Sequence, residues 1–392
     1  MLPEWAPNLH PLIIHFPIAL LVSAAIIDSI GMVLKNQEIW RRGAMGLYVG
    51  GALGAVLAWW TGTSAADSVF LPTDANALLT EHSDLGHYVL YFFLAYGILR
   101  VTMFLLKLDT KALFRTSSYV VGLAGIVLVY VTADHGGQLV YQYGVGVQAV
   151  PQEAVQLSVV ADNSSSAPAR NDLGGWTFKP SRASAWMSSM TTYGATDELQ
   201  MSMRDGGERG DVLGISSSGN SAMFTFDYDM TTVQLDAALN LDDFEGTLMF
   251  VHHVIDANNY HFTSVSNTAM RQGRSENGDI FLMADESYSP AGWHTYRAVA
   301  DQTHFRAYSD QALVAHGHGD DPGVGLVGIR LNGTGTVLIE FVQTASLRGE
   351  GKDGEAAAAP AEEDHSEMEG MPDDDGGSTG EEEETEAADH DH

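Results

Sequence analysis

Cysteine is absent from this 392-residue chain. Its absence excludes disulfides, thiolate metal sites and cysteine nucleophiles. Basic residues are scarce as well: 19 Lys and Arg stand against 51 Asp and Glu, which gives a formal net charge of -32. Such a charge repels phosphates and therefore argues against binding to nucleic acid or to an anionic lipid surface. It is compatible with binding cations or polyols such as sugars.

The N-terminus lacks the basic region of a cleavable signal peptide, since the first basic residue, Lys35, follows the first apolar run. Four apolar stretches instead have the length of about 20 residues that a helix needs to cross a bilayer. We expect a four-helix transmembrane domain over residues 1–148. Its spans are expected at about residues 11–34, 43–63, 86–106 and 118–135.

The basic residues of the short loops predict the orientation. They lie between the first and second spans and between the third and fourth, and the other short loops have none. The positive-inside rule therefore places both basic loops in the cytoplasm. We expect a multi-pass protein of the cytoplasmic (inner) membrane, with the N-terminus and the C-terminal domain outside, in the periplasm or at the cell surface.

The rest of the chain has a different pattern. Residues 149–172 are rich in Ser, Ala, Pro and Asn and are expected to form a linker. Residues 173–348 alternate apolar and polar positions in short runs separated by turn residues, such as those at 332–335. This pattern predicts an all-β antiparallel sandwich (jelly roll) outside the membrane. Residues 349–392 predict a disordered acidic tail that contains His and Met.

The histidines of the membrane domain are all expected at the outer ends of their helices. Imidazoles gathered at one depth on several helices are typical of a haem b or metal-ion site. Residues five apart do not share a helix face, so we expect His15, His87 and His135 to point into the bundle. The alternative is that these histidines are polar caps at the membrane interface. The candidate ligands are His10, His15, His82, His87 and His135.

Two charged residues are expected deeper in the membrane. Asp28 and Arg100 follow His15 and His87 at equal offsets on helices that both run inward. Intramembrane charges are costly and are usually paired. We therefore predict a structural ion pair, with a proton path or an anchor for a cofactor propionate as the functional alternatives.

The tail contains possible ligands for soft metals. Imidazole and thioether groups suit copper, and Cu(I) above all. The alternative is an acidic solubilising tail with incidental His and Met. The candidate copper ligands are His365, Met368, Met371, His390 and His392.

The outer domain has no convincing catalytic constellation. It lacks a Gly-x-Ser-x-Gly elbow, and His252-His253 lies in a strand pattern rather than a helical zinc motif. We nominate no catalytic residue and lean against an enzyme. Its larger aromatic residues are expected in the core rather than as sugar-stacking platforms. These are Trp176, Trp186, Tyr260, Trp293, Tyr296 and Tyr308.

The membrane domain resembles the four-helix DUF2231 family over residues 1–148. The matching residues are His10-Pro-Leu-Ile-Ile-His-Phe-Pro-Ile18 with Asp28, Thr61-Gly62, His82, His87 and the segment from His135 to Gly146. Members of that family are often fused to outward-facing redox modules, which implies that the histidines bind haem or metal. This chain has no Cys-x-x-Cys-His motif, so the resemblance implies a redox partner on another chain.

The outer domain resembles concanavalin-like and laminin-G-like sandwiches, including the 3-keto-disaccharide hydrolase-like domain. The similarity rests on the residues at 258–262, 293–297, 304–310 and 322–328. It implies a fold rather than a function, because such sandwiches bind glycans, bind proteins or hydrolyse sugars. The tail is similar to the His/Met repeats of periplasmic copper-resistance proteins.

These observations leave three hypotheses for an envelope protein anchored in the lipid bilayer. In the first, the histidine cluster binds haem b or a metal ion for redox or metal handling, and the sandwich docks an envelope redox or metal-handling partner or a ligand. In the second, the sandwich binds or processes a glycan on a passive membrane anchor. In the third, the protein is a structural adaptor.

Overall fold

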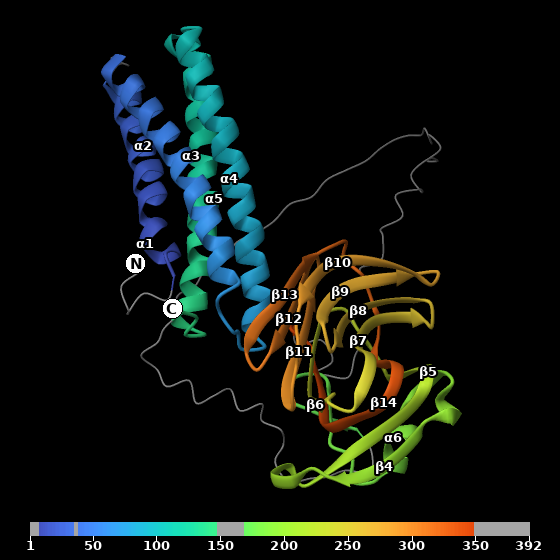
Figure 1. Cartoon of the computed structure of the whole chain (residues 1–392). Helices are drawn as coiled ribbons and strands as arrows, with labels where there is room; N and C mark the ends of the chain where they lie inside the picture. The colour runs from blue at the N-terminus through green and yellow to red at the C-terminus, as the bar shows by residue number, and fades with distance from the viewer. Residues whose placement is uncertain (1–7, 35–37, 147–167, 349–392) are drawn as a thin grey trace, which may run out of the picture. The chain divides into compact units, whose positions relative to one another are not determined.

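The computed structural model describes residues 8–34, 38–146 and 168–348, and it contains an α-helical part and a β-sheet part (Figure 1). The predicted disordered tail, with its candidate copper ligands, and most of the predicted linker lie outside the described residues. Residues 1–355 form one compact unit.

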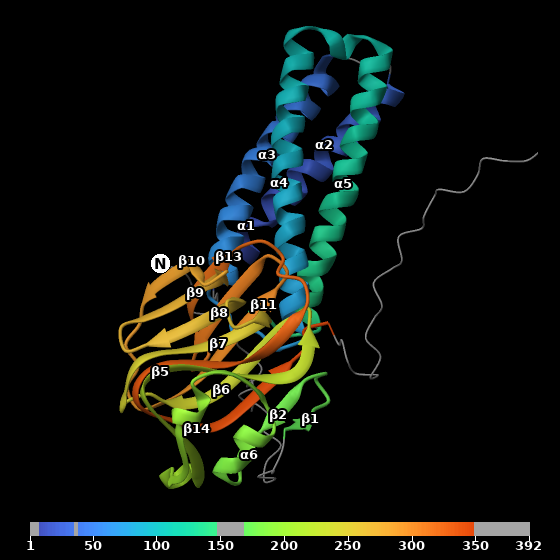
Figure 2. The same cartoon turned by 90° about the vertical axis from the view of Figure 1, so that its right-hand side faces the viewer.

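Four helices have the length and apolar composition needed to span a membrane, as the sequence predicted. They run side by side in both views (Figures 1 and 2). The first span is α1 (His10–Ile13) followed directly by α2 (His15–Val33), and the others are α3 (Glu38–Ala66), α4 (Ala75–Leu105) and α5 (Ala112–Tyr141).

Helix α4 begins at Ala75, well before the expected start of the third span near residue 86. Its first three turns contain Glu81, His82 and Asp84, so their low hydropathy resembled that of a loop. The leading residues Ala75, Ala77 and Leu78 are nevertheless good helix formers. The helix therefore carries polar side chains on its early turns, where the sequence predicted a connection.

An ion pair lies inside the bundle between α2 and α4. Arg100 Nη2 donates to Asp28 Oδ1 at 2.8 Å, and Arg100 Nη1 donates to the second carboxylate oxygen. Nη1 also donates to the Tyr96 hydroxyl at 3.1 Å, and the guanidinium lies 5.0 Å from the centre of the Tyr48 ring. Both charged groups are thus satisfied within the bundle, which lowers the cost of their burial.

The β part is a sandwich in which all recorded strand pairs are antiparallel, as predicted. The principal strand order is β10-β9-β8-β7-β14-β6-β11-β12-β13. The strands on this path are β6 (Val233–Asn240), β7 (Phe244–Asp256), β8 (Asn259–Ser266), β9 (Ala269–Glu276), β10 (Asp279–Ser287), β11 (Trp293–Asp301), β12 (His304–Ser309), β13 (Ala312–His318) and β14 (Gly325–Ala345).

The remaining strands come before β6 in the sequence, and the short helix α6 (Ala183–Ser188) lies between β2 and β3 in the chain. Strand β5 pairs with β3, β4 and β14, and β2 pairs with β1 and β14. The first strand begins inside the predicted linker. These strands are β1 (Ala169–Arg170), β2 (Trp176–Phe178), β3 (Thr191–Gly194), β4 (Gln200–Asp205) and β5 (Asp211–Met230).

Strand β14 belongs to both halves of the sandwich. Its residues 326–335 pair with β7, and its residues 338–345 pair with β6. The sequence predicted a turn at residues 332–335, but the structure has one long curved strand there (Figure 2). Gly335 permits the curvature, because its φ is +109° and a Cβ atom there would lie 2.0 Å from the carbonyl oxygen of Asp243.

The sandwich core combines aliphatic and aromatic side chains. Of the six aromatic residues expected in the core, Trp186, Tyr260, Tyr296 and Tyr308 are buried, while Trp176 and Trp293 are half-buried. The Trp186 ring packs edge-on against Phe224 at a centroid distance of 5.8 Å. The inner face of the sheets is therefore filled, so a functional site must lie on another face or at an end.

Breaking the ion pair in the bundle should destabilise the protein. Asp28→Asn leaves the buried Arg100 charge without its carboxylate, which costs about 3–5 kcal/mol when the partner of a buried charge is removed. We expect a lower unfolding temperature of the detergent-purified protein. The control is Glu38→Gln, which breaks the exposed Arg42–Glu38 pair and should cost about 0–1 kcal/mol. Equal losses in the two variants would contradict this account.

Candidate metal centre

Three histidines gather on one face of β12 and β13. His304 lies opposite His318 in the antiparallel register, and Arg306 lies opposite His316. Directly opposed residues project from the same face of a sheet, and so do residues two apart on a strand. The register therefore brings His304, His316, His318 and Arg306 together.

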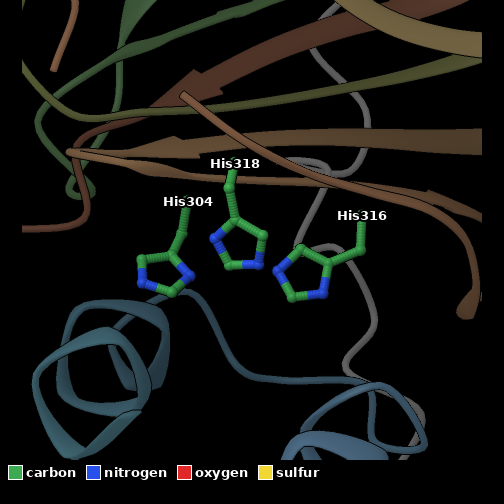
Figure 3. Close-up of side chains that lie close together, drawn as sticks. All are labelled: His304, His316 and His318. Atoms are coloured by element: carbon green, nitrogen blue, oxygen red, sulfur yellow. The ribbon is translucent and has the colours of Figure 1, made fainter. Parts of the chain in front are cut away.

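The three imidazoles are close enough to share an ion. One ring nitrogen from each of His304, His316 and His318 lies within 4.8 Å of the other two. The His318 ring lies between the others, with centroids 4.7 Å from His304 and 4.6 Å from His316 (Figure 3). His304 is buried, His316 is half-buried and His318 is exposed. The cluster thus has a buried side and an open side.

Two carboxylates fix which nitrogen of each ring is available. His304 Nε2 lies 3.4 Å from Asp84 Oδ1, and His316 Nδ1 lies 2.7 Å from Asp67 Oδ1. A neutral imidazole donates to a carboxylate through its N–H and keeps a lone pair on its other nitrogen. Those other nitrogens, His304 Nδ1 and His316 Nε2, are buried without a hydrogen-bond partner in the part of the chain that the structure describes. Carboxylate–histidine pairs of this kind orient metal ligands.

The electrostatic environment favours the neutral form of His304 and His318. Burial lowers the pKa of His304, and the neighbouring Arg306 and His318 lower it further. Burial also lowers the pKa of His318, with further lowering by His316, Arg306 and His87. Because only neutral imidazole offers a lone pair, both rings are available as ligands near neutral pH.

Two of the candidate histidines of the bundle lie close together. The His10 and His82 rings are 6.4 Å apart in an edge-on arrangement. His10 Nδ1 lies 3.3 Å from Thr61 Oγ1, and His82 Nδ1 donates to the Thr132 carbonyl at 3.0 Å. Both rings therefore have an engaged Nδ1.

The three histidines that were expected to point inward have separate contacts. His15 is exposed. His87 Nδ1 donates to the carbonyl of Ser83, while His135 Nε2 lies 3.6 Å from Glu81. Within residues 8–34, 38–146 and 168–348, the sandwich cluster is the one group of three histidines or carboxylates with metal-binding spacing. The bundle histidines do not form such a group.

None of His304, His316 and His318 was among the site residues predicted from the sequence. A signal was present, because His316-Gly-His318 has the period-two spacing that puts both side chains on one face of a strand. His304 could be added only once the register of β12 and β13 was known, and the two orienting carboxylates come from residues more than 200 positions earlier.

A second histidine cluster lies on β7 and β8. His253 Nε2 donates to the Thr231 carbonyl at 3.1 Å, so its Nδ1 accepts from His252 Nδ1 at 2.7 Å. His261 lies opposite His252 in the register, and both rings stack on Phe305. These side chains are part of the packing at one end of the sandwich.

Comparison with known proteins supports the division of the chain. A family model described as a predicted membrane protein (DUF2231) matches residues 6–149, which contain all four membrane-length helices. The N-terminal part is therefore a DUF2231 domain. No curated protein matches the chain.

Several solved structures are similar to part of the chain. A carbohydrate-binding module (CBM66) from Bacillus subtilis has 16% identity and a TM-score of 0.32, over 38% of this chain and 96% of the module. A Bacillus subtilis protein of unknown function with a galectin-like fold has 10% identity and a TM-score of 0.33, over 42% and 91%. A family 16 endo-glucanase from Bacteroides ovatus has 10% identity and a TM-score of 0.31, over 40% and 94%. These are similarities of fold.

The buried histidines of the second cluster should make the sandwich sensitive to acid. Burial lowers the pKa of His252 and holds that of His261 at about 4, against 6.5 for the ordinary group. Between pH 6.5 and about 4 the unfolded chain therefore binds more protons than the folded one, so stability is lost as the pH falls through this window. We expect the unfolding temperature to be constant just above pH 7 and to drop by several degrees towards pH 5.

The variant His261→Phe keeps a ring stacked on Phe305 and removes one titrating group. It should flatten the dependence of the unfolding temperature on pH between 6.5 and 4. An unchanged slope in this variant would show that other groups cause the loss of stability.

Proposed function

We propose that this protein is a membrane-anchored metal-binding protein whose sandwich holds a transition-metal ion at His304, His316 and His318. One observation carries the proposal. Two buried imidazole nitrogens, which have no partner among the described residues, are held in place by carboxylates on their opposite ring nitrogens, beside a third imidazole. Buried polar atoms without partners are rare in native proteins, and a metal ion would satisfy both.

The ligand set favours Zn²⁺ or Cu²⁺, for which imidazole is a good ligand. Three protein ligands leave a fourth position open, as in sites that bind a small ligand or exchange their ion, whereas structural zinc sites have four protein ligands. The exposed His318 gives a path for the ion. The proposed role is therefore metal handling at the membrane, with an envelope metal-handling or redox protein as the proposed partner.

Two further binding proposals concern other parts of the chain. Haem b or a metal ion in the bundle remains a proposal, with His10 and His82 as the pair that the structure brings nearest. Copper binding by the tail remains a proposal for residues outside the described ones.

The second candidate function is binding or processing of a glycan by the sandwich. The similar structures include a carbohydrate-binding module and an endo-glucanase. In the described part of the sandwich, no Trp or Tyr is among the exposed large side chains. A saccharide would therefore be bound mainly by polar groups, and a glycan array with the purified protein would detect it.

The location proposed for the metal site is the outer side of the cytoplasmic membrane. This proposal rests on the basic loops, since Lys107 and Lys111 lie between α4 and α5, whereas the connection between α3 and α4 has no Lys or Arg. Asp67, which contacts His316, lies in that connection, which has no basic residue.

Metal binding should depend on the sandwich histidines. The detergent-purified protein, stripped with a chelator and reloaded with Zn²⁺, should retain about one ion per chain at this site, the stoichiometry of a three-histidine centre. His316→Ala and His318→Ala should lose this ion, as measured by calorimetry and elemental analysis. The matched control is His294→Ala on β11, which removes a histidine of the same domain outside the cluster.

The carboxylate contact provides a finer test. Asp67→Asn leaves all three ligands in place and removes the charge that orients His316, so the affinity should fall by about 10- to 100-fold. Ion retention that is identical in His316→Ala and in the unaltered protein would refute the proposed site. A visible haem spectrum lost in His10→Ala or His82→Ala would place the cofactor in the bundle instead.

The absence of cysteine allows a direct test of orientation. Ser68→Cys and Lys111→Cys each introduce a single thiol at an exposed position. Ser68 lies before the start of α4 and Lys111 lies after its end. A membrane-impermeant maleimide should label Ser68→Cys in intact spheroplasts and should label Lys111→Cys only after lysis. The reverse pattern would place the metal site in the cytoplasm.

A further inference from the structure

A buried arginine lies on the same sheet face as the three histidines. Arg306 is 1% exposed, lies opposite His316 in the register and is two residues from His304. Its Nε and Nη1 atoms have no hydrogen-bond partner in the described part of the chain. Its charge acts on the pKa of both His304 and His318, which places it beside the cluster. A buried guanidinium without a partner is costly.

The neighbouring charges on this face have partners among the described residues, although the second oxygen of Asp301, Oδ2, is buried without one. Arg297 Nε donates to Asp236 at 2.7 Å, and the Asp301 carboxylate accepts from Arg348 Nε at 3.3 Å. The hydroxyl of Tyr308, two residues from Arg306 on the same face, is buried and has no partner among residues 8–34, 38–146 and 168–348. Arg306 and Tyr308 therefore offer hydrogen-bond donors that the described part of the chain does not use.

We propose that this centre binds a small carboxylate-like oxyanion, with one oxygen on the fourth position of the metal ion and the other on the guanidinium of Arg306. This inference rests on the proposed metal site. A planar guanidinium matches a carboxylate or hydrogencarbonate in shape and charge and forms charge-assisted hydrogen bonds with it. The ligand is thus a small oxyanion brought to the metal, and Arg306 selects it.

Formate is a suitable probe, and Co²⁺ is a suitable metal because its visible absorption reports changes in its ligands. Formate added to the Co²⁺-loaded, detergent-purified full-length protein should shift this absorption with saturation. In Arg306→Gln the affinity for formate should fall by about 10-fold or more, as expected when a charge-assisted hydrogen bond is lost. The amount of bound Co²⁺ should stay the same. Arg306→Lys should give an intermediate affinity, because it keeps the charge and loses the planar pair of donors.

The matched control is Arg271→Gln on β9, which removes an exposed arginine paired with Asp285. It should leave the affinity for formate unchanged. Two results would overturn the anion site and leave the metal site standing. One is a Co²⁺ spectrum of the unaltered protein that formate does not shift. The other is an affinity for formate that is equal in Arg306→Gln, Arg306→Lys and the unaltered protein. Absence of any Co²⁺ absorption dependent on His316 would overturn the metal site and the anion site together.

Discussion

The antiparallel register of β12 and β13 is the constraint on which the candidate centre depends. It places His304 opposite His318 and Arg306 opposite His316. These four polar side chains therefore share one face of the sheet. A shift of one residue would turn every side chain of a strand to the other face. The strand β11 holds this register from the other side, because its pairing with β12 runs without a break from Tyr296 to Asp301.

The helical part completes the centre by supplying the charges that orient it. Asp67 follows α3 and Asp84 lies on the early polar turns of α4, and each accepts a hydrogen bond from one histidine. Arg297 makes a similar link, since its Nη1 donates to the carbonyl of Leu71 at 2.9 Å while its guanidinium pairs with Asp236. The DUF2231 part and the sandwich therefore both contribute to one set of polar contacts.

Sequence reasoning works best where one physical signal dominates. Hydropathy alone locates four membrane-length helices, and period-two alternation identifies the sandwich. Asp28 and Arg100 were predicted to pair because they were expected at a similar depth in the membrane. These side chains are in contact in the structure. The early turns of α4 were missed because hydropathy does not distinguish a polar helix from a loop. The cluster at His304 was missed because it depends on how β12 and β13 align. The sequence of either strand alone does not specify that alignment.

The curved strand β14 has a consequence for how the protein is made. It is the last strand among the described residues, yet it pairs with β2, β5, β6 and β7 and holds a central place in the sheet. Pairing between segments so distant in sequence forms slowly. The sandwich therefore cannot close while its chain is still leaving the ribosome. Strands β2, β5, β6 and β7 each lack one pairing partner until residue 345 has emerged, so an exported sandwich would need protection from aggregation during its transit.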